Sequence, residues 1–173
     1  LASSFATATD RRLAAGAPIL DTRLRLQTVA DLLAERLCHE LASAPAQAPV
    51  VFVNLAGGPA MDSLNALLLA QKKWPLLSDH PVQIIVFDAH SEAPRFGANA
   101  LEALRAPGAP LAGLDAVLKH VPYDWNHPET LQTPLRELPA NAVVLGSSEG
   151  GIFHYTDDPT IKKTLSVLRE ATG

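Results

Sequence analysis

Glycine and acidic residues at the ends of two apolar runs are the first candidates for ligand contact in this chain of 173 residues. The run 49–55 stops at Gly57-Gly58-Pro59, where glycine lets the backbone approach a ligand closely and the following helix offers N–H groups to a carboxylate or phosphate. The run 82–87 ends at Asp88, whose two carboxylate oxygens can accept hydrogen bonds from both hydroxyls of a ribose. Each feature also has a structural interpretation, as a tight turn and as a turn-forming acid. Together they favour a nucleotide-like ligand.

Two further apolar segments are followed by an acid and by a serine. In Tyr123-Asp124-Trp125 the carboxylate suits a purine, because it accepts from the exocyclic amine while an aromatic ring walls the pocket. The alternative is a tryptophan packed under a turn. The segment 146–150 matches G-x-S-x-G, the nucleophile elbow of hydrolases, but that mechanism needs an acid and then a histidine after Ser148. His154 is the one histidine that follows, six residues later and ahead of the nearest aspartates, so we interpret the match as accidental.

Strands and helices must alternate to position these segments. Unbroken apolar runs indicate strands covered on both faces, as in a parallel sheet, and apolar residues at helical spacing fall between them. We therefore predict an α/β protein with a doubly wound, mostly parallel sheet in the strand order 3-2-1-4. The expected strands are 49–55, 82–87, 114–121 and 142–145, and the expected helices are 24–43, 61–72, 98–105, 129–138 and one that begins at Asp157 or Asp158. All of 1–173 is expected to form one domain, with an irregular extension at 1–23 and the α/β core at 24–173.

Composition and charge narrow the classes of function. The net charge of −4 comes without a basic block, so we expect no nucleic-acid partner. The single Cys38 excludes a disulfide framework and a four-cysteine zinc site and suits a reducing cytoplasm. Asp88-x-His90 lacks a third ligand at a suitable spacing, so no metal site is expected. No apolar run reaches the roughly 18 residues of a membrane span, and we expect no membrane partner.

Read in order, the four segments resemble class I S-adenosylmethionine-dependent methyltransferases, and among them the O-methyltransferase branch that includes leucine carboxyl methyltransferases. That branch has V-N-L-G-x-G at its first strand, an acid closing the second, an aspartate with an aromatic residue after the third, and E-G-x-x-x-Y after the fourth. The corresponding segments here are Val53-Asn54-Leu55-Ala56-Gly57-Gly58, Asp88, Asp124-Trp125 and Glu149-Gly150-Gly151-Ile152-Phe153-His154-Tyr155.

The resemblance implies a Rossmann-like methyltransferase fold with S-adenosylmethionine as cofactor and a role for each matched residue. It assigns the methionine part of the cofactor to Asn54, Ala56, Gly57 and Gly58, the ribose to Asp88, the adenine to Asp124, and acid–base help to Glu149 and Tyr155. Alanine stands at two positions where the family has glycine, and we expect the methyl groups of Ala56 and Ala60 to reach into the cofactor's space.

The implied function is O-methyl transfer to a carboxylate or hydroxyl of a small molecule or protein that the residues do not identify. The family has seven strands and this chain ends after the fourth and its helix, so a non-catalytic nucleotide-binding or assembly module is an alternative, and a serine hydrolase using Ser148 is another. The fourth strand is expected to lie at an apolar sheet edge, which favours self-association into a homo-oligomer.

Overall fold

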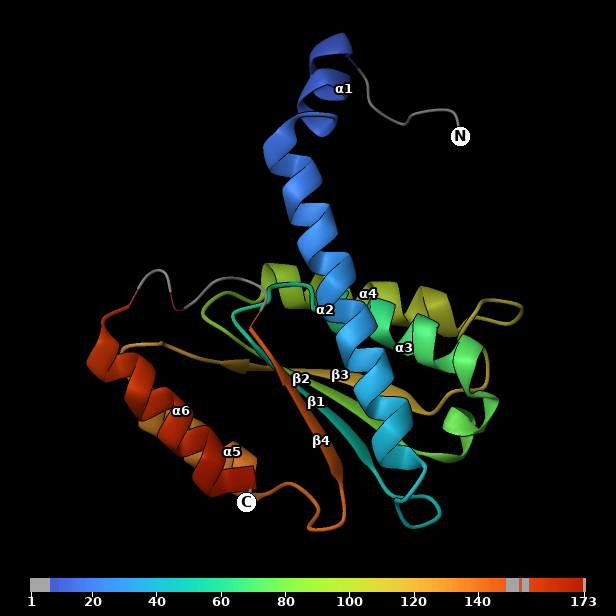
Figure 1. Ribbon diagram of the computed structural model, residues 1–173, viewed down its shortest axis with the longest axis vertical. Coiled ribbons are helices and arrows are strands. Elements are labelled where there is room, and N and C mark those ends of the chain that lie inside the picture. The colour runs from blue at the N-terminus through green and yellow to red at the C-terminus, as the bar shows by residue number, and fades with distance from the viewer. Residues whose placement is uncertain (1–6, 149–152, 154–155, 173) are drawn as a thin grey trace.

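Four parallel strands form one sheet at the centre of the molecule. A computed structural model describes residues 7–148, 153 and 156–172. The strands follow the order β3-β2-β1-β4 with helices on both faces (Figure 1), which confirms the predicted α/β fold and strand order. Their bounds are Val50–Leu55 for β1, Val82–Asp88 for β2, Ala116–Pro122 for β3 and Val143–Ser147 for β4.

Strand β1 is buried along its whole length because helices cover both faces of the sheet. Phe52 packs in one core cluster with residues of α2 (Ala17–Leu41), α3 (Met61–Lys73) and α4 (Glu92–Arg105). Val53, the next residue, points to the opposite face and packs with residues of α5 (Gln132–Arg136) and α6 (Asp158–Thr172). Two short 3₁₀ helices, η1 (Pro75–Asp79) and η2 (Pro128–Leu131), precede β2 and α5. The continuous apolar runs of the sequence are thus explained by burial on both faces.

The N-terminal segment, for which the sequence favoured an irregular or weakly helical stretch at 1–23, is helical over most of its described residues. Helix α1 (Ala8–Ala14) starts at a capping box, in which Asp10 N donates to Thr7 Oγ1 at 3.1 Å and Thr7 N donates to Asp10 Oδ2 at 3.0 Å. Helix α2 begins at Ala17, seven residues earlier than expected, with Pro18 in its first turn, where a missing N–H costs nothing. Apolar periodicity could not find this part of α2, because no neighbouring element buries it.

The first turns of α2 and all of α1 extend away from the sheet (Figure 1). The buried residues of α2 begin at Ala30, and the preceding stretch carries large apolar side chains in solvent. Those more than half exposed are Leu13, Leu20 and Leu24. Helix α1 and the first turns of α2 therefore offer an apolar surface, and they do not cover the outer edge of β4 (Figure 1).

Two other expected boundaries moved. Helix α4 begins at Glu92 rather than at residue 98, and the predicted helix 129–138 is divided into η2 and the short α5. Helix α6 is capped as expected, because Thr160 N donates to the Asp157 carboxylate at 2.9 Å. None of the described helices combines the length and the apolar character that a membrane span requires.

Candidate functional site

The carboxyl ends of the strands meet at one edge of the sheet, and the predicted cofactor-binding residues, all of which the structure describes, follow or close the strands there. Strand register places Leu55 opposite Phe87, the residue before Asp88, and Asn54 opposite Ser147. Asp88 in turn lies opposite Pro122, two residues before Asp124. Adjacent strands are about 4.8 Å apart, so the loops that follow two neighbouring strands of the sheet lie side by side.

Asn54 is fully buried and joins β1 to the start of α3 and to β4. Its Nδ2 donates to Asp62 Oδ1 at 2.7 Å and to Ser147 Oγ at 3.2 Å, and it lies 3.4 Å from Ser63 Oγ. Asp62 Oδ1 also accepts from Ser63 N at 2.8 Å. A Cβ added at Gly57 would lie 1.8 Å from Asn54 Oδ1, so glycine is required at this position by close packing. The side chain of Asn54 therefore packs against Gly57 and holds the turn in position through its hydrogen bonds to α3 and β4.

Every second residue of the turn between β1 and α3 has a left-handed backbone conformation. Ala56, Gly58 and Ala60 have φ values of 51°, 53° and 53°. This conformation costs an L-residue about 1–2 kcal/mol, so Ala56 and Ala60 hold backbone strain in this turn. Ala60 is fully buried in the core cluster of α2 and α3, and the expectation that its methyl group enters the cofactor's space is therefore wrong. Ala56 is partly buried against the cluster on the α6 face.

Asp88 ties the end of β2 to the glycine turn. Its Oδ2 accepts from Gly58 N at 3.1 Å and its Oδ1 accepts from His90 N at 3.0 Å. Its main-chain oxygen accepts from His120 Nε2 at 2.8 Å and from Tyr123 N at 3.1 Å. An ionised carboxylate has about four acceptor positions, so each oxygen keeps capacity for one more donor. The acid expected to bind a ligand also holds the turn in place.

Asp124 lines a cavity of about 400 Å³ between the ends of β2 and β3. Its Oδ1 accepts from Asn126 N and from Asn126 Nδ2, both at 2.9 Å, and its Oδ2 lies 4.0 Å from His127 Nε2. Of the two aromatic neighbours of Asp124, Tyr123 lines the cavity, whereas Trp125 packs against the core cluster on the α6 face. Burial raises the pKa of the Tyr123 phenol. The other lining residues are Ala89, Pro122, His127 and Thr130.

Glu129, close to this cavity in sequence, is held as an anion. A hydrogen bond from the Lys163 ammonium lowers the pKa of the Glu129 carboxyl to about 2 from an ordinary 4.5. Its other oxygen lies 3.3 Å from His127 Nδ1. Glu129 thereby links η2 to α6, the helix that covers this face of the sheet.

The two predicted acid–base residues, Glu149 and Tyr155, lie outside the described residues, as does His154. Ser148 is described, and its Oγ is buried without a hydrogen-bond partner among the described residues. A nucleophilic serine needs a base within hydrogen-bond reach, so this geometry gives the hydrolase hypothesis no support. The described residues also hold no group of three or more histidine, cysteine and acidic side chains suited to a metal ion.

The sequence analysis did not predict three residues of this site, which are Asp62, Ser147 and His120. Asp62 and Ser63 lie in the first turn of α3, and their burial beneath the glycine turn depends on Asn54, which is eight residues from Asp62. His120 is one of the polar residues in β3, whose alternating burial is typical of a half-exposed strand. The sequence signal that could have indicated His120 was a histidine in a strand predicted to lie beside the strand that ends at Asp88.

Comparison of the chain with protein families, with curated proteins and with solved structures gave no match in any of the three. The arrangement at the carboxyl edge therefore carries the functional argument by itself. It combines a braced glycine turn, an acid bonded to that turn, and a cavity with a second acid on its rim.

Proposed function

We propose that the chain is a methyltransferase-like domain that binds S-adenosylmethionine at the carboxyl edge of the sheet. The observation that carries the proposal is the hydrogen bond between Gly58 N and Asp88 Oδ2, next to the cavity that Asp124 lines. It fixes the acid beside the turn, at the point where ligands of doubly wound sheets bind. The parallel order β3-β2-β1-β4 is the order expected for the first four strands of this fold.

The residues present fit the cofactor on two structural grounds. The methyl group of Ala60 is buried in the core, so it does not narrow the space above the turn. The cavity at the end of β3 has an apolar wall and one acid with an oxygen, Asp124 Oδ2, that lies 4.0 Å from its nearest ion-pair partner. An adenine ring needs this combination of an apolar wall and an acceptor for its amine.

S-adenosylmethionine supplies a methyl group that is already activated on a sulfonium, so the protein's task is to bind, orient and exclude water. Asp88 accepts from the ribose hydroxyls through the remaining lone pairs of its two oxygens. Asp124 accepts from the adenine amine, and the strained turn at 56–60 holds the backbone close to the methionine part. Asn54 positions that turn through its contact with Gly57 and does not touch the ligand. The acceptor is a hydroxyl or a carboxylate.

Calorimetric titration with S-adenosylhomocysteine tests the proposal. We expect Asp88→Ala and Asp124→Ala each to weaken binding by about 1.5–3 kcal/mol, the scale of hydrogen bonds to a charged group. Asp115→Ala is the matched control, since Asp115 lies at the opposite edge of the same sheet, ahead of β3. Asp88→Asn separates binding from bracing, because its amide keeps an acceptor for Gly58 N.

Unchanged affinity in a folded Asp88→Ala protein would remove Asp88 from the binding site. Absence of binding to the unmodified chain would refute the cofactor assignment as a whole. Adenosine serves as a second ligand: equal affinity for adenosine and S-adenosylhomocysteine indicates a nucleotide-binding module that does not recognise the amino-acid part.

A further inference from the structure

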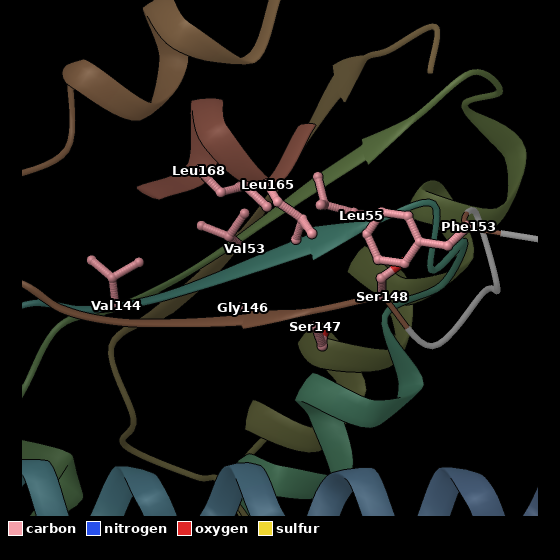
Figure 2. Close-up of a pocket in the computed structure, with 9 residues that line it drawn as sticks. All are labelled: Val53, Leu55, Val144, Gly146, Ser147, Ser148, Phe153, Leu165 and Leu168. Atoms are coloured by element: carbon pink, nitrogen blue, oxygen red, sulfur yellow. The ribbon is translucent and has the colours of Figure 1, made fainter. Parts of the chain in front are cut away.

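A second cavity, of about 260 Å³, lies between β4, β1 and α6. Figure 2 shows Phe153 beside Ser148 at one end and Leu165 and Leu168 reaching in from α6. The cavity shares Ser147 with the hydrogen-bond network of Asn54, but none of the residues proposed to contact the cofactor lines it. Its nine lining residues are Val53, Leu55, Val144, Gly146, Ser147, Ser148, Phe153, Leu165 and Leu168.

Gly146 leaves this space open without a structural need for glycine. A Cβ added there would meet a single atom within 4 Å, the Val53 carbonyl oxygen at 4.0 Å, and the backbone is not in the left-handed region. Glycine inside a strand weakens it, and it often marks a place where a ligand or another backbone approaches closely. Neither crowding nor backbone geometry explains this glycine, whereas an occupant of the cavity does.

Ser148 supplies an independent sign of an occupant. Its Oγ is buried and has no hydrogen-bond partner among the described residues, although buried hydroxyl groups are usually bonded. Ser147, its neighbour, points to the other face of β4 and accepts from Asn54 (Figure 2). The Ser148 hydroxyl therefore faces the cavity at its Phe153 end, with both a donor and an acceptor to offer.

The lining also defines the charge and size of a ligand. Among the described residues, the nine that line it include no charged side chain, and burying an unpaired charge against apolar groups is strongly unfavourable. An apolar cavity of about 150 Å³ is enough to bind benzene, so this larger one takes a monocyclic to small bicyclic ring with a substituent.

We propose that this cavity is a binding site for a small, neutral, mainly apolar molecule that carries one hydroxyl or carbonyl group, with that group bonded to Ser148. The ring packs over Gly146 and against the two leucines of α6. This site does not depend on the proposed cofactor function, because none of the residues proposed to contact the cofactor lines it. Its failure and the failure of the cofactor assignment are thus separate results.

Three fluorinated probes of similar size test the proposal with the full chain by fluorine NMR line broadening. They are 4-fluorophenol, which is neutral and carries a hydroxyl, fluorobenzene, which lacks it, and 4-fluorobenzoate, which is charged. We expect 4-fluorophenol to bind most tightly and 4-fluorobenzoate at least about tenfold more weakly, because a carboxylate loses its hydration in the cavity. Absence of broadening at millimolar 4-fluorophenol, or tightest binding of the benzoate, overturns the proposal.

Two variants locate the binding. Gly146→Leu fills the cavity and is expected to abolish binding of 4-fluorophenol and fluorobenzene, while Val117→Leu on β3, the other edge strand, leaves both unchanged. Ser148→Ala is expected to weaken 4-fluorophenol by about three- to tenfold, the worth of one hydrogen bond, and to leave fluorobenzene unaffected. Gly146→Ala, a smaller change, replaces Gly146→Leu if that variant does not unfold cooperatively, and it should weaken both neutral probes. Binding that persists in the folded Gly146 variant, or equal loss of both neutral probes in Ser148→Ala, refutes the assignment.

Discussion

The contact between Gly57 and Asn54 predicts a strong energetic coupling between the turn and the end of β1, three residues earlier. A Cβ at residue 57 would lie 1.8 Å from Asn54 Oδ1 and 2.7 Å from its Cγ, where ordinary contact is 3.4–4 Å. Gly57 does not have a positive φ, so alanine there meets no backbone strain and its cost is steric. Asn54 must move, and its hydrogen bonds to Asp62 and Ser147 are lost when it does.

The magnitudes follow from these contacts. Gly57→Ala is expected to cost about 3 kcal/mol, from about 1 kcal/mol of overpacking strain and about 2 kcal/mol for the loss of the buried hydrogen bonds. Asn54→Ala is expected to cost about 2 kcal/mol, because it removes the same bonds without a clash. In the double variant the methyl group of residue 57 occupies space that Asn54 vacates. Its cost should stay near about 2 kcal/mol, well below the sum of about 5 kcal/mol for the single changes.

Urea unfolding of the four proteins in this cycle measures the coupling, which we expect to be about 2–3 kcal/mol in favour of the double variant. Gly58→Ala combined with Asn54→Ala is the matched control. A Cβ at Gly58 meets only Ala93 Cβ, at 3.4 Å, so its backbone strain should add to the Asn54 cost. If the costs of Gly57→Ala and Asn54→Ala add to within about 0.5 kcal/mol, Asn54 does not brace the turn.

Three further outcomes are expected. Ala56→Gly should stabilise the protein by about 0.5 kcal/mol, because relief of left-handed strain exceeds the entropy gained by the unfolded chain, whereas Ala103→Gly in α4 should cost about 1 kcal/mol; thermal unfolding compares them. The depressed pKa of Glu129 means that its bond with Lys163 stabilises the fold above about pH 4.5 and that this contribution is lost as the pH falls toward 2; Glu129→Gln should remove that part of the pH dependence of stability. Within the described chain β4 pairs with β1 alone, so we predict self-association through its outer edge; light scattering at micromolar concentration that returned the monomer mass of 18.4 kDa would contradict it.

Much of the fold was readable from local pattern. The runs 49–55 and 82–87 are apolar at every or nearly every position, and such runs form strands covered on both faces wherever helices flank them. Because segments with helical spacing of apolar residues alternate with these runs, only a few strand orders are possible. The cap at Asp157 was equally local, since its carboxylate accepts a hydrogen bond from the N–H of Thr160, three residues later.

The unpredicted features depend on contacts between distant residues. Gly58 and Asp88 are thirty residues apart, and Asn54 and Ser147 are ninety-three apart, so no spacing rule connects them. The early start of α2 was missed for the opposite reason: residues 17–25 are exposed, and no described element covers them to impose an apolar stripe.

The sequence by itself determined which residues stand at the strand ends, because burial of the strands dictates the apolar runs and the runs define their ends. Tertiary structure alone decided what those residues do there. Packing turned Asp88 toward the glycine turn, buried Ala60 in the core, and left an open space over Gly146. Hydrogen bonds and voids arise where elements meet, and that geometry is set by how whole helices and strands pack together.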